Sequence, residues 1–562
     1  MSISARICFF LVIPVLLSGG CKSTVPDPVA ATLILKNAKV WTGNRSRPEA
    51  EAVAIRGHDI VYVGTNKKAL VLAGKNTRIL DLEGKRMVPG FIDGHMHFLT
   101  MAGEPMPHAD LITTVSEEDF ARRIGEAVRK LPKGKWFSGG PWKYDQWKDP
   151  HLPTRKVLDR YTPDNPVYIA GSAGHFAMVN SKALEIAGID RNTPDPFGGE
   201  IVRYPGTNIP TGLLKNNAMD LVGKYVDIKK LSFDKQVERA LKKLKKANAV
   251  GVTAVDENLD DVETIRLYNT LLSEGKLTVR AHIYAKIGKL NVWLESGLAT
   301  DIGNRYIHFC GLKAQTDGAL GSSSAYFYEP YKDSPGNYGI VMEDLSPGGS
   351  LERRFRVCVE NGIQPMAHAI GDRAIHEVLE MFERIGGKDC AKYRFRMEHV
   401  QHPRPEDIKR MGEMRIIVSV QPNSAVEDAA MAEKRLGEKR CKTTYPFRDF
   451  LDAGAIMAFG SDGGMDPVRG IYFAVTRNTL DNKYPEGWQP HQKITVEEAL
   501  RAYTWGTAYA SFFDHRTGSL EPGKLADMVV LDQDILNIPH DKIKDVRVVM
   551  TIVDGKVVFE TK

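Results

Sequence analysis

The chain has 562 residues, of which 43% are hydrophobic and 26% are charged, and its formal net charge is +6. This length accommodates one large domain with a smaller one, or two to three domains of ordinary size. The composition excludes a disordered, collagen-like or coiled-coil protein. So small a charge indicates no nucleic-acid partner, and the one lysine-rich run, Leu241–Lys246, is typical of the solvated face of a helix.

The N-terminus has the features of an export signal. Arg6 precedes an apolar run, Ile7–Leu17, which ends at Ser18-Gly19-Gly20-Cys21. A run this short is typical of a secretory signal rather than a membrane-spanning helix. The Cys after Gly-Gly resembles a bacterial lipoprotein cleavage site, with residues 1–21 as signal and Cys21 as the acylated residue. The alternative is an ordinary secretion signal in which Cys21 is incidental. Either interpretation predicts export, and the first predicts a lipid anchor in a bacterial envelope membrane.

Cysteine spacing identifies no disulfide. Beyond Cys8 and Cys21, the chain has four widely separated cysteines without a paired motif: Cys310, Cys358, Cys390 and Cys441. Disulfides are permitted in an exported protein, but none can be assigned from this spacing.

The two ends of the chain share a β-rich pattern. Residues 32–87 alternate apolar and polar positions between Gly and Asn turns, which predicts antiparallel strands. Residues 517–562 repeat this pattern, with Asp554-Gly555 as a hairpin turn. We expect the two ends to form one small β-sandwich domain outside the central body.

The central body, residues 88–516, alternates strand-like and helix-like segments, which favours a parallel α/β fold. Amphipathic helices are expected at Leu351–Asn361, Ala374–Ile385 and Val496–Tyr503. The strand candidates are Met87–His97, Gly251–Glu257, Thr278–Ala285, Ile307–Gly318, Gly362–Gly371, Tyr393–His402, Arg415–Pro422 and Ala455–Gly464. Eight such strands predict a (β/α)₈ TIM-like barrel, with an open doubly wound sheet as the alternative. The long segment of about residues 108–232 after the first strand predicts an inserted subdomain over the active face.

Potential metal ligands lie where the predicted strands end. His95 and His97 are two residues apart on a strand, so both rings face the same side and can reach one ion. Four other strands end in Lys313, His368, His399 and Asp462. The carboxyl ends of barrel strands meet at one mouth, so these side chains are expected to form a single polar cluster.

Several motifs then resemble the amidohydrolase superfamily. Val88–His97 (VPGFIDGHMH) is similar to its first-strand signature, and Gly523–Val530 to its return into the small β domain. Six further segments resemble amidohydrolase family 3, the YtcJ-like branch: Gly174–Leu184, Lys313–Gly318, His368–Asp372, Glu398–His399, Ser419–Pro422 and Gly460–Asp462. These motifs occur in order and span nearly the whole mature chain.

The resemblance implies a two-metal hydrolase. His95, His97 and Asp462 would bind the more buried ion, and His368 and His399 the second. Lys313 would bridge the ions as a carbamate formed with carbon dioxide. Such ligands suit zinc, with iron, manganese or cobalt as alternatives. The ions would activate a bridging water, Asp462 would act as base and then acid, and the C–N bond of a small amide-type substrate would be hydrolysed.

Other candidate residues concern the substrate. His175 is expected to hydrogen-bond the substrate carbonyl or the tetrahedral oxyanion, with a structural role as the alternative. Trp142, Tyr144 and Trp147 are candidates for an apolar pocket, although aromatic residues in an insert more often pack its own core. Asp317 is a weaker candidate that could orient a metal ligand.

Two positions depart from the family pattern. Asn216 stands where relatives often carry an acid, and Asp256 where they often carry His. Both are expected to affect the pocket rather than the metals. One alternative function is a mononuclear-metal deaminase of the same superfamily, which would lack the bridging lysine. A second is a non-catalytic solute-binding lipoprotein. The sequence carries no signature of oligomeric state.

Overall fold

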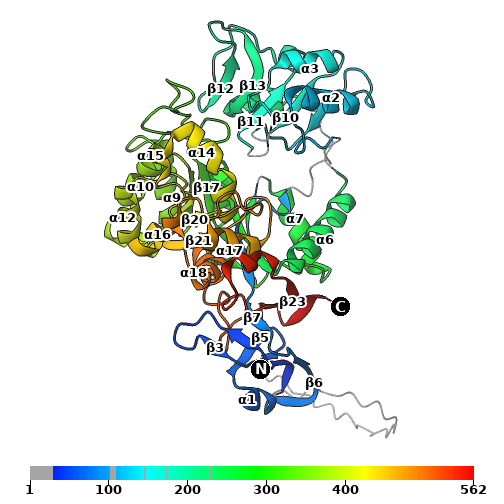
Figure 1. Ribbon diagram of the computed structural model, residues 1–562, viewed down its shortest axis with the longest axis vertical. Coiled ribbons are helices and arrows are strands. Elements are labelled where there is room, and N and C mark those ends of the chain that lie inside the picture. The colour runs from blue at the N-terminus through cyan, green and yellow to red at the C-terminus, as the bar shows by residue number, and fades with distance from the viewer. Residues whose placement is uncertain are drawn as a thin grey trace, which may run out of the picture.

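A computed structural model describes residues 30–100, 109–144, 147–171, 174–226, 231–259 and 261–561. The predicted signal and Cys21 lie outside these residues. Three bodies follow one another along the long axis of the molecule: the insert, the barrel and the small β domain (Figure 1). Nowhere in the described ranges is there a helix of the length and apolar character needed to cross a bilayer.

The central body is the predicted (β/α)₈ barrel. Its strands lie in the order β21-β20-β19-β18-β17-β15-β14-β8, with every neighbouring pair along this path parallel. Between the two outer strands, the Asp462 N–H donates to the His95 carbonyl over 2.8 Å. Each strand overlaps one of the eight predicted segments. They are β8 (Phe91–Met96), β14 (Val252–Leu259), β15 (Arg280–Lys286), β17 (Ile307–Gln315), β18 (Gln364–Ala369), β19 (Arg396–His399), β20 (Ile417–Val420) and β21 (Ile456–Phe459).

Amphipathic helices surround these strands and bury their apolar faces in one large core. In α6, Leu244 is buried whereas Lys242 and Lys246 are exposed, so the lysine-rich run is a solvated helix face as predicted. The main helices are α6 (Phe233–Ala249), α7 (Glu263–Ser273), α8 (Leu290–Glu295), α9 (Ser350–Glu360), α10 (Asp372–Gly386), α12 (Pro405–Glu413), α16 (Phe447–Ala453) and α17 (Pro467–Thr476). Shorter ones are α11 (Cys390–Tyr393), α13 (Pro422–Glu427), α14 (Ala429–Leu436), α15 (Glu438–Cys441), α18 (Val496–Arg501) and α19 (Thr507–Ala510).

The third predicted helix changes its winding. It begins at Val496 behind a Thr495 capping box, but α18 ends at Arg501 and is followed by a π-helix, Ala502–Gly506. The Thr507 hydroxyl donates to the Ala502 carbonyl over 2.8 Å, a side-chain bond that spans the wider turn.

Both chain ends build the small β domain, as predicted. One sheet has the order β5-β4-β1-β6 and the other β24-β23-β22-β7-β2-β3, and a shared apolar core lies between them. The Asp554-Gly555 turn has positive φ at both residues, 55° and 74°, as a two-residue hairpin requires. The strands are β1 (Ala31–Lys36), β2 (Lys39–Trp41), β3 (Glu49–Ala50), β4 (Ala52–Arg56), β5 (Asp59–Gly64), β6 (Ala73–Asp81), β7 (Arg86–Pro89), β22 (Met528–Leu531), β23 (Val548–Val553) and β24 (Lys556–Glu560), with helix α1 (Asn66–Leu70).

The first predicted strand serves two domains. Its first part is β7 of the small domain and its second part is β8 of the barrel, with Gly90 between them. A side chain at Gly90 would come within 2.2 Å of the Thr253 hydroxyl, so only glycine fits this close crossing. The boundary between the domains therefore falls at Gly90, slightly beyond the predicted residue 88.

The insert is a subdomain with its own sheet, in the order β12-β13-β11-β10-β9. It lies beyond the end of the barrel opposite the small β domain (Figure 1). Its elements are α2 (Glu117–Val128), β9 (Phe137–Gly139), α3 (Arg155–Tyr161), β10 (Val167–Ala170), β11 (Phe176–Val179), α4 (Ser181–Ala187), β12 (Gly199–Arg203), β13 (Pro210–Asn216) and α5 (Asp220–Gly223). The four cysteines of the described ranges lie in the barrel, where all are buried and none forms a disulfide.

Candidate metal centre

The predicted ligands come from strands and turns at one end of the barrel. His95, His368 and His399 lie in β8, β18 and β19, and Asp462 lies just beyond β21. His399 and Asp462 both have positive φ, 72° and 52°, which is uncommon for residues other than glycine. Such backbone conformations occur where the surrounding structure over-determines a functional site.

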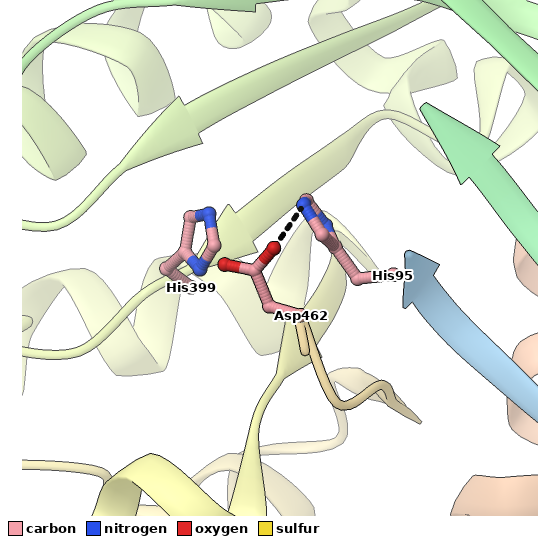
Figure 2. Close-up of side chains that lie close together, drawn as sticks. All are labelled: His95, His399 and Asp462. Atoms are coloured by element: carbon pink, nitrogen blue, oxygen red, sulfur yellow. Dashed lines mark ion pairs between the residues drawn. The ribbon is translucent and has the colours of Figure 1, made fainter. Parts of the chain in front are cut away.

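The most compact set of donor atoms belongs to His95, His399 and Asp462 (Figure 2). Their ligand atoms all lie within 4.8 Å of one another, and His95 Nε2 lies 3.6 Å from Asp462 Oδ1. The sequence-based assignment placed His399 with the second ion, so this set takes members from both expected ligand groups.

The remaining predicted ligands surround this set. Lys313 Nζ lies 3.0 Å from His95 Nε2, and the lysine charge also acts on His368, His399 and Asp462. The His368 ring is 4.6 Å from the His399 ring, and the half-buried His97 ring is 6.1 Å from that of His95, between centroids. The structure therefore brings the predicted ligands into one cluster.

Hydrogen bonds fix the tautomers of three of the histidines. His95 Nδ1–H donates to the Glu398 carboxylate, and His399 Nδ1–H donates to Gln421 Oε1 over 2.8 Å. His368 Nε2–H donates to the Gly318 carbonyl over 3.3 Å. Each ring keeps one nitrogen with a lone pair, which is the form that binds a metal.

Burial keeps these rings neutral. Desolvation is the first cause that lowers the pKa of His95, His368 and His399 well below the usual value, and neighbouring positive charges lower it further. Neutral imidazoles with a free lone pair, beside a carboxylate, fit a divalent cation because no ligand proton must be displaced at neutral pH.

A buried polar network supports His95 from within the barrel. Glu398 also accepts from Arg396, whose guanidinium donates to Asp256 over 2.6 Å. Asp256 further accepts from His282 over 2.9 Å and from Ser511 over 2.8 Å. Asp256 is fully buried in this network, which corrects the expectation that it affects the substrate pocket.

Sequence reasoning assigned no role to Arg396 or Glu398. Both lie in β19, a strand buried along its whole length, and both are fully buried themselves. The sequence signal that could have identified them is a pair of charged residues two positions apart in a predicted buried strand. Fully buried charges occur almost only in pairs or at functional sites.

The insert contributes His175 and Asn216. The His175 ring lies 5.1 Å from that of His368, and its Nδ1 is 3.1 Å from Asn216 Oδ1. Desolvation lowers the pKa of His175 to about 4, so the ring is neutral at pH 7. Asn216 therefore bears on the site, as the sequence suggested.

Two of the three candidate aromatic residues pack the insert itself. Trp142 and Trp147 are buried, their rings are stacked at 6.1 Å, and both belong to the insert's apolar core. The pocket interpretation is therefore wrong for these two residues, because neither ring is accessible to a ligand. Tyr144 is half-buried, and its hydroxyl donates to the Gly321 carbonyl of the barrel over 3.0 Å.

Asp317 organises the loop after β18. Its carboxylate accepts from the backbone N–H groups of Tyr326, Ile370 and Gly371, and it lies 3.4 Å from His368 Nε2. Burial raises the pKa of Asp317 to about 7. It has no exposed surface, and its carboxylate lies beside His368, which makes it a candidate to orient that ring.

Known proteins resemble this chain in sequence and in fold. A sequence model of the amidohydrolase family matches residues 78–559. A putative amidohydrolase, YtcJ of Bacillus subtilis (strain 168), is 31% identical over 93% of this chain and 98% of its own length. An N-substituted formamide deformylase of Arthrobacter pascens is 28% identical over 94% of this chain and 98% of its own. An uncharacterized metal-dependent hydrolase of Pyrococcus horikoshii OT3 superposes with a TM-score of 0.70 at 27% identity, covering 90% of this chain and 99% of its own.

The family model covers most of the chain, and the relatives match it almost from end to end. The matched range, residues 78–559, includes the barrel strands and all the candidate ligands. The chain therefore belongs to the amidohydrolase family, as a hydrolase of the metal-dependent superfamily.

Proposed function

We propose that the protein is an exported amidohydrolase that cleaves the C–N bond of a small amide-type substrate. The observation that carries this proposal is the convergence of His95, His399 and Asp462 around Lys313. Relatedness to a formamide deformylase supports a C–N bond as the target. Export and lipid attachment at Cys21 rest on the sequence pattern of residues 1–21.

The ligand chemistry supports two divalent ions, with zinc as the expected metal. His95, His97 and Asp462 would hold one ion, and His368 and His399 the other. Lys313 would join them after its neutral amine adds to carbon dioxide and loses a proton, since a carbamate offers two anionic oxygens. Divalent ions held there would lower the pKa of bound water and polarise the scissile carbonyl.

Asp462 is the proposed proton carrier. Its side chain is 39% exposed, so it can meet a substrate while it also reaches His95. Desolvation raises its pKa, against the opposing charges of His97 and Lys313. A carboxylate that lies beside the ligands and is also exposed would be placed to accept a proton from attacking water and then donate it to the leaving nitrogen.

His175 is the proposed partner of the substrate oxygen. That role requires a proton on Nε2, and therefore an Asn216 amide that donates to Nδ1. With Oδ1 toward the ring, Asn216 Nδ2 is buried without a partner within the described ranges; the reversed amide gives Nδ2 the ring nitrogen as acceptor and moves Oδ1 to the unpaired position. We propose that Asn216 takes this orientation and so holds His175 as a neutral donor.

Two alternative functions have less support. A mononuclear deaminase would have no use for a lysine among its ligands, whereas Lys313 Nζ lies 3.0 Å from His95 Nε2. A solute-binding lipoprotein would not need neutral histidines beside a carboxylate with a raised pKa.

Metal content tests the proposal most directly. About two ions per chain are expected in the wild type, falling to one or none in Lys313→Ala. Lys68→Ala, at an exposed lysine of α1 in the small β domain, should keep both ions. Hydrolysis of N-substituted formamides should disappear with a chelator and return with zinc. One ion in both wild type and Lys313→Ala would reject the bridged site and direct assays to deaminase substrates.

A further inference from the structure

A cavity lies at the opposite end of the barrel from the candidate metal ligands. It has a volume of about 780 Å³, which suits a small organic ligand. One wall is the small-domain loop that carries Arg45, and another is formed by α18 and the π-helix. Arg415, in the turn before β20, and Ile456, the first residue of β21, also line it.

The acidic residues of this cavity are mostly neutralised by their neighbours. Glu498 accepts from Arg448 through both oxygens, at 2.9 Å each. Glu521 accepts from Asn44 over 2.8 Å and lies 3.5 Å from Lys524. Glu497 is the lining carboxylate that has no such partner among the described residues.

Three guanidinium groups of the cavity have no bonded carboxylate among the described residues, and the charge of Glu497 is the one that acts in favour of Arg501. Within the described part of the chain, no hydrogen bond or ion pair to the side chains of Arg45, Arg415 or Arg501 is present. Arg45 and Arg501 line the same cavity, and burial and the Arg45 charge lower the pKa of Arg501 despite the opposing charge of Glu497. Arg45 of the small β domain and Arg501 of the barrel therefore line one cavity, in which Glu497 is the carboxylate without a bonded partner among the described residues.

Apolar surface lies beside these charges. Leu451, Ile456 and Trp505 line the same cavity, and Trp505 is half-buried within the π-helix. Single π-helical turns are rare and frequently occur at functional sites. A ligand that fits would therefore have an anionic end for the guanidinium groups and an apolar or aromatic body.

We propose that this cavity, formed between the small β domain and the barrel, binds a small organic phosphate or carboxylate with an aromatic body. Its anionic group lies between Arg45 and Arg501, and its body packs against Trp505. Guanidinium groups approaching from two walls suit a group with several acceptor oxygens, because each can bond a different oxygen.

Calorimetric titration of the full-length, metal-loaded protein tests this site. Phenyl phosphate and benzoate are the anionic probes, and benzyl alcohol is the neutral counterpart. At least one anion should bind, and benzyl alcohol should bind at least about tenfold more weakly, because it lacks the charge-assisted bonds. Arg45→Gln and Arg501→Gln should each weaken the anion by about tenfold or more.

Arg191→Gln is the matched control, because Arg191 is an exposed arginine of the insert. It should leave binding unchanged. Arg45 lies on an exposed loop, so its variant is expected to fold, and the unfolding temperature without ligand checks this for every variant. Failure of both anions to bind would overturn the proposal. So would binding that survives in both Arg45→Gln and Arg501→Gln, since the anion would then occupy the metal centre or an unspecific surface.

Discussion

The protons on three histidines of the candidate metal centre, His95, His368 and His399, are controlled by residues outside the ligand set. Glu398, Gln421 and the Gly318 carbonyl each accept one ring N–H and leave the other nitrogen with a lone pair. The sequence pointed to the ligands through their positions at strand ends. It could not identify these acceptors, because they come from other strands and loops and meet the rings only after the barrel closes.

Glu398→Gln should weaken metal binding about 10- to 100-fold, the usual effect of losing such a supporting partner. The amide is a weaker acceptor for His95 Nδ1–H, and it removes the negative charge beside Arg396. Competition with a chromophoric chelator measures the affinity. Glu438→Gln, at an exposed site on α15, is the control and should change nothing. Equal affinities in all three proteins would contradict the supporting role.

Asn216→Asp should raise the pKa of His175 from its value of about 4, because a carboxylate beside Nδ1 stabilises the imidazolium. On acidification, the His175 ring of the variant would therefore become protonated at a higher pH than the His175 ring of the wild type. Histidine NMR of the zinc-loaded protein, titrated from pH 8 to pH 4, measures the shift. Asn304→Asp is the control, because it makes the same amide-to-carboxylate change elsewhere. Its carboxylate can still accept the hydrogen bond from the N–H of Ile307. An unchanged His175 titration would show that residue 216 does not control this ring.

At the scale of elements, the barrel depends on helices whose charges are paired as well as on apolar packing. Glu352 in α9 is almost fully buried and binds Arg384 over 2.9 Å and Arg356 over 2.8 Å. Desolvation raises the pKa of Glu352, but bonds from the Gly348 N–H and both arginines outweigh it and lower the pKa to about 2. Periodicity predicted α9 and α10 well. It could not predict this pairing, which depends on how the two helices pack.

Glu352→Gln should therefore lower stability at neutral pH, by about 2 kcal/mol once solvent screening is allowed for. A carboxyl whose folded pKa is lowered stabilises the protein above its unfolded pKa and loses this contribution as pH falls toward the folded value. The difference between variant and wild type should be full at pH 7 and shrink between about pH 5 and pH 2. Urea unfolding at pH 7 and pH 3.5 measures it. A difference independent of pH would contradict the ionic origin.

At the scale of the whole molecule, one arginine connects the barrel to the small β domain. Arg280, at the start of β15, is fully buried and donates to both oxygens of Asp527 over 2.7 Å. It also reaches Asp554, in the turn between β23 and β24, over 3.2 Å. The domain built from both chain ends is thereby held to the barrel by a buried ionic contact.

Arg280→Met should destabilise the protein by about 3–5 kcal/mol, because Asp527 would remain buried without its counter-charge. The double variant Arg280→Met/Asp527→Asn removes both charges and should recover a large part of this loss. Thermal and urea unfolding of the three proteins measure the effect. A double variant as unstable as the single one would contradict the electrostatic explanation and indicate that shape alone matters.

The sequence by itself determined the barrel, the composite β domain and the insert, and it identified the candidate metal ligands, because each depends on local periodicity or on short motifs. Only the tertiary structure decided the partners of those residues. It placed Asp256 in a buried network, packed Trp142 and Trp147 inside the insert, and brought His175 next to His368. The physical reason is that burial, tautomer and pairing depend on atoms contributed by segments that are distant in the chain, and one sequence does not specify the distances between them.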